Sequence, residues 1–203
     1  MSMRILAASV AVVAFPQLAA AQSTNATPAT PATAPVAATA ATPTTAPAPV
    51  ANPVSTAFRA DAASVGKILM AAADDMPADR YGFKPTPAQM SFADIMVHLA
   101  QGNDLLCSKI GGVAAPTRTK VDAKATKEAL VARLKESFAF CDQALANLDD
   151  SKLGDQMQLF GPKMRTRAEA VIITTGDWAD HYSQVAIYMR LNNLLPPTAK
   201  KAM

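Results

Sequence analysis

Apolar residues recur three and four positions apart in four segments of the chain, the spacing that brings side chains onto one face of an α-helix. These segments cover about residues 57–75, 91–112, 126–148 and 166–195. Prolines and glycines separate them, and no stretch sustains the alternation typical of a strand. The pattern therefore predicts an all-α protein in which four amphipathic helices form a four-helix bundle.

Two of the predicted helices begin with a capping box, in which a Ser or Thr is followed three residues later by an acidic residue. Ser91 and Asp94 have this spacing at the start of the second helix, and Thr166 and Glu169 have it at the start of the fourth. Such pairs satisfy backbone N–H groups that the first helical turn leaves without a partner. They indicate where these two helices begin.

The connection between the second and third helices, GVAAPTRTKVDAKA, is about fourteen residues long. At roughly 3.3 Å per extended residue it can reach beyond about 40 Å, which is more than a helix of about 20 residues spans. The chain can therefore return to its starting end, so that helices two and three run parallel. Parallel packing would place Cys107 and Cys141, each in the later half of its helix, at similar heights.

Cys107 and Cys141 are the only cysteines of the chain. If the protein is exported, an oxidising compartment favours one intramolecular disulfide between them. A pair of free buried thiols is the alternative. A reactive nucleophile is disfavoured, because neither cysteine has an obvious base near it in sequence.

The N-terminal stretch MSMRILAASVAVVAFPQLAAAQS combines Arg4, a short apolar run and small residues ahead of Gln22. This order predicts a secretory signal peptide over residues 1–21, and hence a periplasmic or secreted protein. The apolar run is shorter than the about 20 residues of a membrane span, so we expect no stable span after cleavage. Residues 22–56 carry no charge and are rich in Ala, Pro and Thr, which predicts a disordered spacer ahead of one domain at 57–203.

The charged residues of the chain are interspersed rather than clustered. There are 19 basic and 16 acidic residues, which give a formal net charge of +3. A nucleic-acid-binding protein would normally carry a basic stripe, and the sequence has none. We therefore expect no nucleic-acid partner.

The two histidines fall where they could meet. In the fourth predicted helix, His181 lies on a row at heptad spacing with Thr174 and Tyr188, next to the row of Trp178, and so points inward. Asp177 precedes His181 by four residues, and His98 lies midway along the second helix. If these helices face each other, two imidazoles and a carboxylate converge on one point, a ligand set suited to Zn, Ni, Mn or Fe.

A simpler interpretation stands beside the metal site. An inward-facing histidine is commonly a core residue that hydrogen-bonds a nearby carboxylate or carbonyl group. Asp177 or Asp180 could serve as that partner for His181 without any ion. The spacing alone leaves both interpretations open.

Three stretches resemble the DinB-like family, which has thiol-transferase and maleylpyruvate isomerase relatives: MPADRYGFKPTPAQMSFADIMVHLAQGNDLLC, LKESFAFCDQAL and DHYSQVAIYMRLNNLLPP. The resemblance implies a bundle with its helices up, down, down and up. It also implies a metal site made by a histidine of helix two and an H-x-x-x-H pair of the last helix. His98 and His181 match this pattern, and Asp177 departs from it by replacing the first histidine of the pair.

The resemblance implies metal-dependent transfer of a thiol to an electrophile, or isomerisation, with Gln184 or Tyr188 orienting a small-molecule substrate. It also implies a homodimer formed through a bundle face. Export argues against thiol chemistry, because such thiols are cytosolic. A hydrolase, with Asp180 as the available base, is chemically feasible. The competing class is a non-catalytic exported binding or structural module with a degenerate metal site, and the residues do not decide between enzyme and module.

Overall fold

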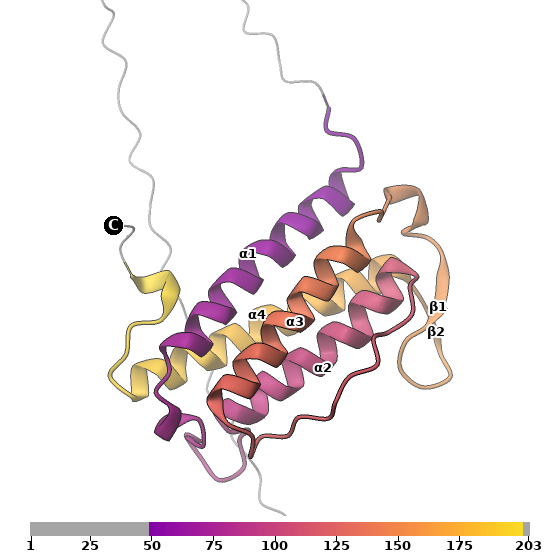
Figure 1. Cartoon of the computed structure of the whole chain (residues 1–203). Coiled ribbons are helices and arrows are strands. Elements are labelled where there is room, and N and C mark those ends of the chain that lie inside the picture. Colours follow the sequence, from indigo (N-terminus) through magenta and orange to yellow (C-terminus); the bar gives the residue numbers. More distant parts are fainter. Residues whose placement is uncertain (1–48, 201–203) are drawn as a thin grey trace, which may run out of the picture. The chain divides into compact units, whose positions relative to one another are not determined.

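A computed structural model describes residues 49–200, and these form one bundle (Figure 1). Its helices are α1 (Pro53–Asp75), α2 (Phe92–Gly111), α3 (Lys127–Leu145) and α4 (Arg167–Leu191). The shorter elements are the strands β1 (Gln156–Gln158) and β2 (Met164–Thr166) and the 3-10 turns η1 (Ala78–Arg80), η2 (Asp150–Lys152) and η3 (Pro197–Ala199). The predicted signal peptide and all but the end of the predicted spacer lie outside the described residues.

The four predicted helices are confirmed, and so is their order of directions. Figure 1 shows α1 and α4 running one way along the bundle and α2 and α3 running the other way, which is the up, down, down, up arrangement. Helix α2 packs against α3 and α4, and α1 packs against the same two helices. Within residues 49–200, no helix is long and apolar enough to cross a membrane.

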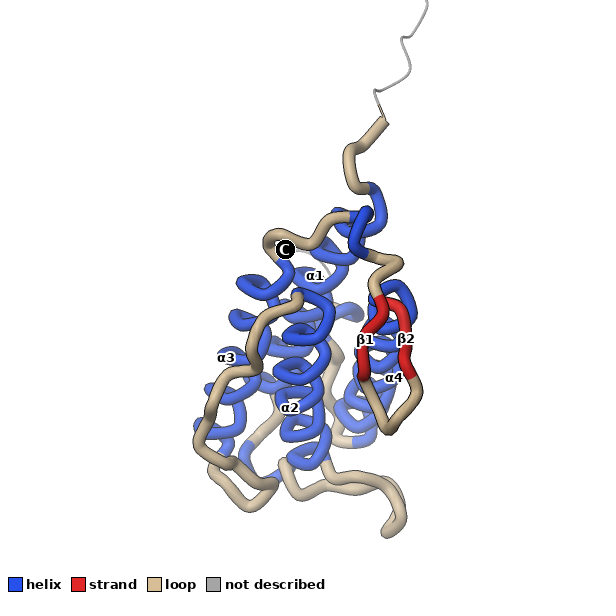
Figure 2. Tube along the Cα trace, turned by 90° about the vertical axis from the view of Figure 1, so that its right-hand side faces the viewer, coloured by secondary structure: helices blue, strands red, loops and turns tan. Residues whose placement is uncertain are grey.

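The crossover between α2 and α3 is fastened to both helices by Arg118. Its Nε donates a hydrogen bond of 2.9 Å to Asp104 of α2, and its guanidinium bonds the side chain and the carbonyl of Glu136 of α3 at 3.1 Å each. Arg133 of α3 also donates to Asp104, so one carboxylate joins two arginines. Figure 2 shows the connection lying along the outside of the bundle.

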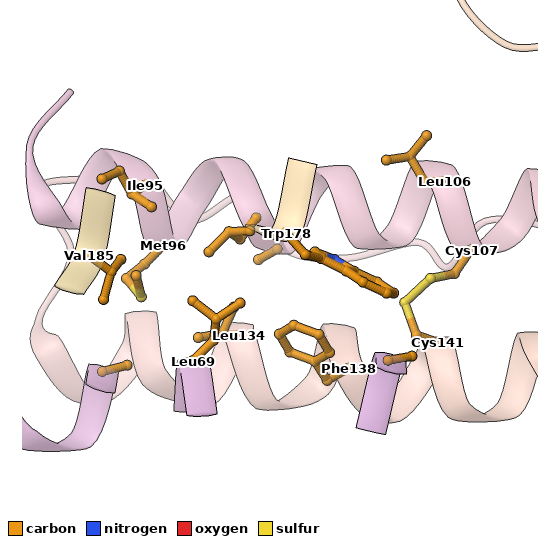
Figure 3. Packing of buried hydrophobic residues seen from close by; sticks show 14 of the residues in the cluster. Leu69, Ile95, Met96, Leu106, Cys107, Leu134, Phe138, Cys141, Trp178 and Val185 are labelled. Atoms are coloured by element: carbon orange, nitrogen blue, oxygen red, sulfur yellow. A yellow bond between two sulfur atoms is a disulfide. The ribbon is translucent and has the colours of Figure 1, made fainter. Parts of the chain in front are cut away.

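Aromatic and aliphatic side chains from all four helices fill the centre of the bundle (Figure 3). Trp178 of α4 is fully buried, and its indole stacks on the ring of Phe58 of α1 at 5.6 Å between centroids. Phe138 of α3 lies on another side of the same indole at 6.0 Å. Helices α1 and α3 therefore enclose the side chain that follows Asp177 in the sequence.

The predicted disulfide is present, because Cys107 and Cys141 are bonded with their Cα atoms 5.1 Å apart. Both cysteines are fully buried. The two helices approach closely beyond the bridge: a Cβ atom added at Gly111 would lie 2.1 Å from the carbonyl oxygen of Ala144. Only glycine can occupy that position of α2 without moving α3.

Helix α1 starts at Pro53, four residues before the predicted boundary at 57. The cause is a capping interaction with a residue that is distant in the sequence. The carboxylate of Asp150 accepts from the backbone N–H groups of Val54 and Ser55 at 3.0 and 2.7 Å. These bonds satisfy the free donors of the first turn and extend the helix into the predicted spacer.

Helix α4 ends at Leu191, four residues earlier than the predicted end at 195. Asn193 has a φ of 60°, in the left-handed region, which interrupts the helical path. Between α3 and α4 the strands β1 and β2 pair antiparallel over three residues each. This short hairpin is all the sheet that residues 49–200 contain, in keeping with the all-α prediction.

Candidate metal centre

His98, Asp177 and His181 meet on one side of the bundle between α2 and α4. One potential ligand atom from each side chain can be chosen so that all three atoms lie within 4.8 Å of one another. His98 comes from the middle of α2, and the other two residues come from successive turns of α4. The predicted convergence of these three side chains is therefore confirmed.

The carboxylate of Asp177 contacts one nitrogen of each imidazole. Its Oδ1 is 3.3 Å from Nε2 of His98 and 3.4 Å from Nδ1 of His181. The imidazole rings stack on each other, with centroids 4.5 Å apart and an angle of 24° between their planes. The three side chains thus form one continuous contact cluster across the helix interface.

A backbone hydrogen bond fixes the orientation of His181. Its Nδ1 lies 2.8 Å from the carbonyl oxygen of Asp177, one turn earlier in α4. A carbonyl oxygen only accepts, so Nδ1 donates this bond, and in the neutral ring Nε2 is the nitrogen left to bind an ion. Histidine ligands in metal sites are commonly held by this kind of contact, which leaves the other nitrogen free for the ion.

The cluster is open on the side of α2. The side chain of His98 is 46% exposed, whereas that of His181 is only 10% exposed. A bound ion would therefore have one ligand anchored in the core and one at the surface. This arrangement leaves room for an exogenous molecule at the outer side.

The donor set fits a divalent transition metal. Two imidazole nitrogens and a carboxylate oxygen are ligands that Zn, Fe, Mn and Ni accept. Bonds of about 2.1 Å in tetrahedral geometry separate two ligand atoms by about 3.4 Å. The 3.3 Å between His98 Nε2 and Asp177 Oδ1 agrees with that spacing. The three side chains therefore offer suitable ligand atoms close to one another, within 4.8 Å.

Buried polar contacts fix α4 against α2 beside the cluster. The indole Nε1 of Trp178, the residue after Asp177, donates 2.8 Å to Oδ1 of Asn103 in α2. Asn103 also donates 3.0 Å to the hydroxyl of Ser137 in α3. Because Asn103 is only 1% exposed, these bonds are shielded from water and set how α4 is rotated about its axis.

A cavity of about 360 Å³ adjoins the cluster. His98 and Asp177 form part of its wall, as does Gly102, one turn after His98 in α2. The rest of the wall is largely apolar and includes Phe160, which lies in the β1–β2 turn. The candidate metal ligands therefore face a space that can admit a small molecule.

The residues predicted to orient a substrate lie apart from this cavity wall. The Tyr188 hydroxyl donates 2.9 Å to the carbonyl of Met90, and its side chain is buried. Gln184 donates a 2.8 Å hydrogen bond to Asp180, one turn earlier in α4. Asp180 is exposed, and the Nδ1 of His181 bonds the backbone carbonyl of Asp177 rather than the Asp180 carboxylate.

Two residues that shape the site are absent from the sequence prediction. Asn103 follows Gly102 within GNDLLC. The spacing of apolar residues does not reveal that this polar side chain is buried by its hydrogen-bond partners. Phe160 lies in the turn of the hairpin between α3 and α4. In the sequence, a large apolar residue next to Gly161 is the one feature that could have pointed to it. Both acquire their place through tertiary contacts.

A family model identifies the family to which the chain belongs. The model of the DinB superfamily matches residues 64–185. No functionally curated protein matches the chain. Among solved structures, the chain is similar to a DinB-like protein from Bacillus subtilis, with a TM-score of 0.58, 17% identity, and coverage of 72% of this chain and 99% of that one.

Two further solved structures have the same fold. A DinB-like protein from Bacillus cereus gives a TM-score of 0.59 at 12% identity, covering 70% of this chain and 95% of its own. A conserved protein from Enterococcus faecalis gives 0.56 at 19% identity, covering 68% and 96%. The family match spans all three candidate ligands. The chain therefore belongs to the DinB superfamily.

Proposed function

We propose that this protein is an exported divalent-metal protein whose ion is held by His98, Asp177 and His181. The observation that carries the proposal is the grouping of three ligand atoms within 4.8 Å of one another, supplied by two helices. The hydrogen bond from Nδ1 of His181 to the Asp177 carbonyl supports it, because it leaves Nε2 available to the ion. Family membership is consistent with a metal site at this place in the bundle.

The chemistry that fits this site is a metal-dependent transferase or hydrolase reaction. A divalent ion acts as a Lewis acid and lowers the pKa of a nucleophile that reaches it. The chain's own part is to hold the ligands: His181 is anchored by the Asp177 carbonyl, and His98 leaves the outer side open. The neighbouring cavity provides the space in which a substrate would meet the ion.

Export is part of the proposal, and two features support it. The first 21 residues have the layout of a signal peptide. The buried Cys107–Cys141 disulfide fits an oxidising compartment, since cytosolic proteins rarely keep such bridges. Expression with a periplasmic fractionation and N-terminal sequencing of the product tests this part, because a mature protein that starts at Gln22 is expected.

Metal content and metal-dependent stability test the site. The purified protein is stripped with a chelator, reloaded with Zn, Ni, Mn or Fe, and followed by metal analysis and thermal unfolding. We expect one ion per chain, and at a free metal concentration about 100 times the Kd a gain of about 2.7 kcal/mol in the free energy of unfolding. His98→Ala and His181→Ala should each remove both effects.

A matched control separates a specific site from weak binding to surface carboxylates. Asp177→Asn should abolish the stabilisation, whereas Asp180→Asn should leave it intact. Asp180 lies three residues away on the same helix, is exposed, and contacts only Gln184 among the described hydrogen bonds. Equal effects of the two substitutions would contradict the proposed site.

The second candidate is a non-catalytic exported module with a degenerate site. One observation favours it: His98 Nε2 and Asp177 Oδ1 lie within hydrogen-bonding distance at 3.3 Å, so the cluster satisfies itself without an ion. A protein that binds no metal and is fully stable without it would support this alternative.

A further inference from the structure

The cavity beside the candidate ligands has an apolar half that the metal site does not explain. Leu105 and Leu106 of α2, Ile173 of α4 and Phe160 of the hairpin turn line it. Phe160 is 49% exposed and Leu105 is 37% exposed. Single exposed apolar residues are ordinary, but these two line the same half-open pocket.

The hairpin places Phe160 by local bonding. Strands β1 and β2 pair from Gln156 with Thr166 to Gln158 with Met164, so the turn between them stands beside α4. The side-chain amide of Gln158 donates 2.8 Å to the carbonyl of Gly161. Gly161 has a φ of 64°, a conformation that glycine adopts without strain and that turns the chain directly after Phe160.

Glycine at position 102 keeps the centre of the wall open. A Cβ atom added there would meet only the Asp177 Oδ2, at 3.9 Å, which is ordinary contact distance. The helix therefore has room for a larger side chain at this position. Glycine in a helix interior costs about 1 kcal/mol relative to alanine. Because the packing here would accept alanine, the packing does not explain why this position is a glycine.

The charged groups that line the cavity indicate which kind of ligand it can bind. Among residues 49–200, His98 and Asp177 are the titratable groups that line the cavity. A divalent ion held with one carboxylate and two neutral imidazoles leaves a net positive charge at that end of the space. An anionic group on the ligand would balance this charge, while an apolar ring would cover Phe160 and Leu105.

We propose that this cavity binds a small organic anion that carries an apolar ring, with its anionic group at His98 and Asp177 and its ring between Phe160, Leu105 and Ile173. The volume of about 360 Å³ suits one such molecule. The inference rests on the proposed metal function, since the ion supplies the positive charge. It goes beyond that function by stating the class of ligand.

Benzoate and acetate are suitable probes, because they share a carboxylate and differ by the ring. The zinc-loaded protein is titrated with each, and the backbone amide resonance of Asp177 is followed by NMR. We expect benzoate to bind roughly tenfold more tightly than acetate, as burial of a ring face against apolar side chains would give. The metal-free protein should lose the affinity for both anions.

Three variants test the assignment of the ring to this cavity. Phe160→Ala should remove most of the tenfold preference for benzoate by deleting the outer wall. Gly102→Leu should remove it by filling the space, and metal analysis of this variant is needed because the new side chain would contact Asp177. Met164→Ala is the matched control, since Met164 is 50% exposed on the same hairpin and does not line the cavity.

The possible outcomes distinguish the proposed ring pocket from the proposed metal site. Uptake of zinc with equal affinities for benzoate and acetate would overturn the ring pocket and leave the metal site in place. A preference for benzoate that survives both Phe160→Ala and Gly102→Leu would overturn it as well. Failure to take up zinc would overturn the metal site and this inference together.

Discussion

The indole nitrogen of Trp178 donates a 2.8 Å hydrogen bond to the side-chain oxygen of Asn103, 75 residues earlier in the sequence. This bond joins the helix that carries Asp177 and His181 to the helix that carries His98. Neither side chain is a candidate ligand. Their contact nevertheless fixes the relation between the two helices at the height where the candidate ligands meet.

Asn103→Ala should destabilise the fold and loosen the site. The substitution leaves the buried indole N–H of Trp178 without an acceptor, and an unsatisfied buried group of this kind costs about 1–3 kcal/mol. Urea unfolding at neutral pH measures the loss. Gln143→Ala, which removes an exposed amide from α3, should change the free energy of unfolding by less than about 0.5 kcal/mol.

The disulfide should contribute a large part of the stability. Its cysteines are separated by 34 residues, and a closed loop of that size reduces the entropy of the unfolded chain by an amount worth about 3–4 kcal/mol. Urea unfolding of Cys107→Ala/Cys141→Ala beside the oxidised wild type tests this expectation. Thiol titration of the denatured wild type should detect no thiol before reduction and both cysteines after it, and thiols in the unreduced sample would contradict the bridge.

The sequence pattern was sufficient for the helices and the crossover, and it placed the three candidate ligands where they converge if α2 and α4 face each other. Each rests on a periodic or local signal: apolar spacing for the helices, connection length for the parallel α2 and α3, and the separation of Asp177 from His181 by one helical turn. The resemblance to the family added the expectation that His98 faces His181. Apolar spacing, connection length and a separation of one helical turn can all be read from a single sequence.

The rest depends on partners that are distant in sequence. Asp150 extends α1 although 95 residues separate it from Ser55, and Asn103 is buried because Trp178 and Ser137 lie opposite. A polar residue carries no periodic mark that says whether it is solvated or buried with a partner. Such contacts become visible only when the helices are placed in three dimensions.

The Asp104 carboxylate should be more important than either arginine that bonds it. Its removal by Asp104→Asn leaves Arg118 and Arg133 without their shared counter-charge in a largely buried position, which should cost about 3 kcal/mol. The control is the exposed pair of Lys135 and Asp74, whose side chains are 49% and 51% exposed. Lys135→Ala should cost at most about 1 kcal/mol in urea unfolding. Similar losses in the two variants would show that the crossover is not held by Asp104.

The start of α2 should lose stability in acid. The side-chain and backbone hydrogen bonds from Ser91 hold the pKa of Asp94 below its usual range. A lowered folded-state pKa stabilises the protein above the unfolded-state pKa, and this contribution is lost as the pH falls through the folded-state value. Ser91→Ala should lower the free energy of unfolding at pH 7 by about 1 kcal/mol. The gap between wild type and variant should narrow as the pH is lowered toward about 2, and a gap independent of pH would refute the role of the charged Asp94.

Asp177 should determine which metal the site prefers. A carboxylate suits a harder ion such as Mn, whereas imidazole favours Ni and Zn. Asp177→His replaces the central oxygen ligand by a nitrogen, at a position whose side chain already lies near both histidines. The ratio of the Kd for Mn to the Kd for Ni, measured by calorimetry, should therefore rise by about tenfold or more, equivalent to roughly 1.4 kcal/mol. Asp180→His, on the exposed side of the same helix, should leave this ratio unchanged, and an unchanged ratio in Asp177→His would mean that Asp177 does not bind the ion.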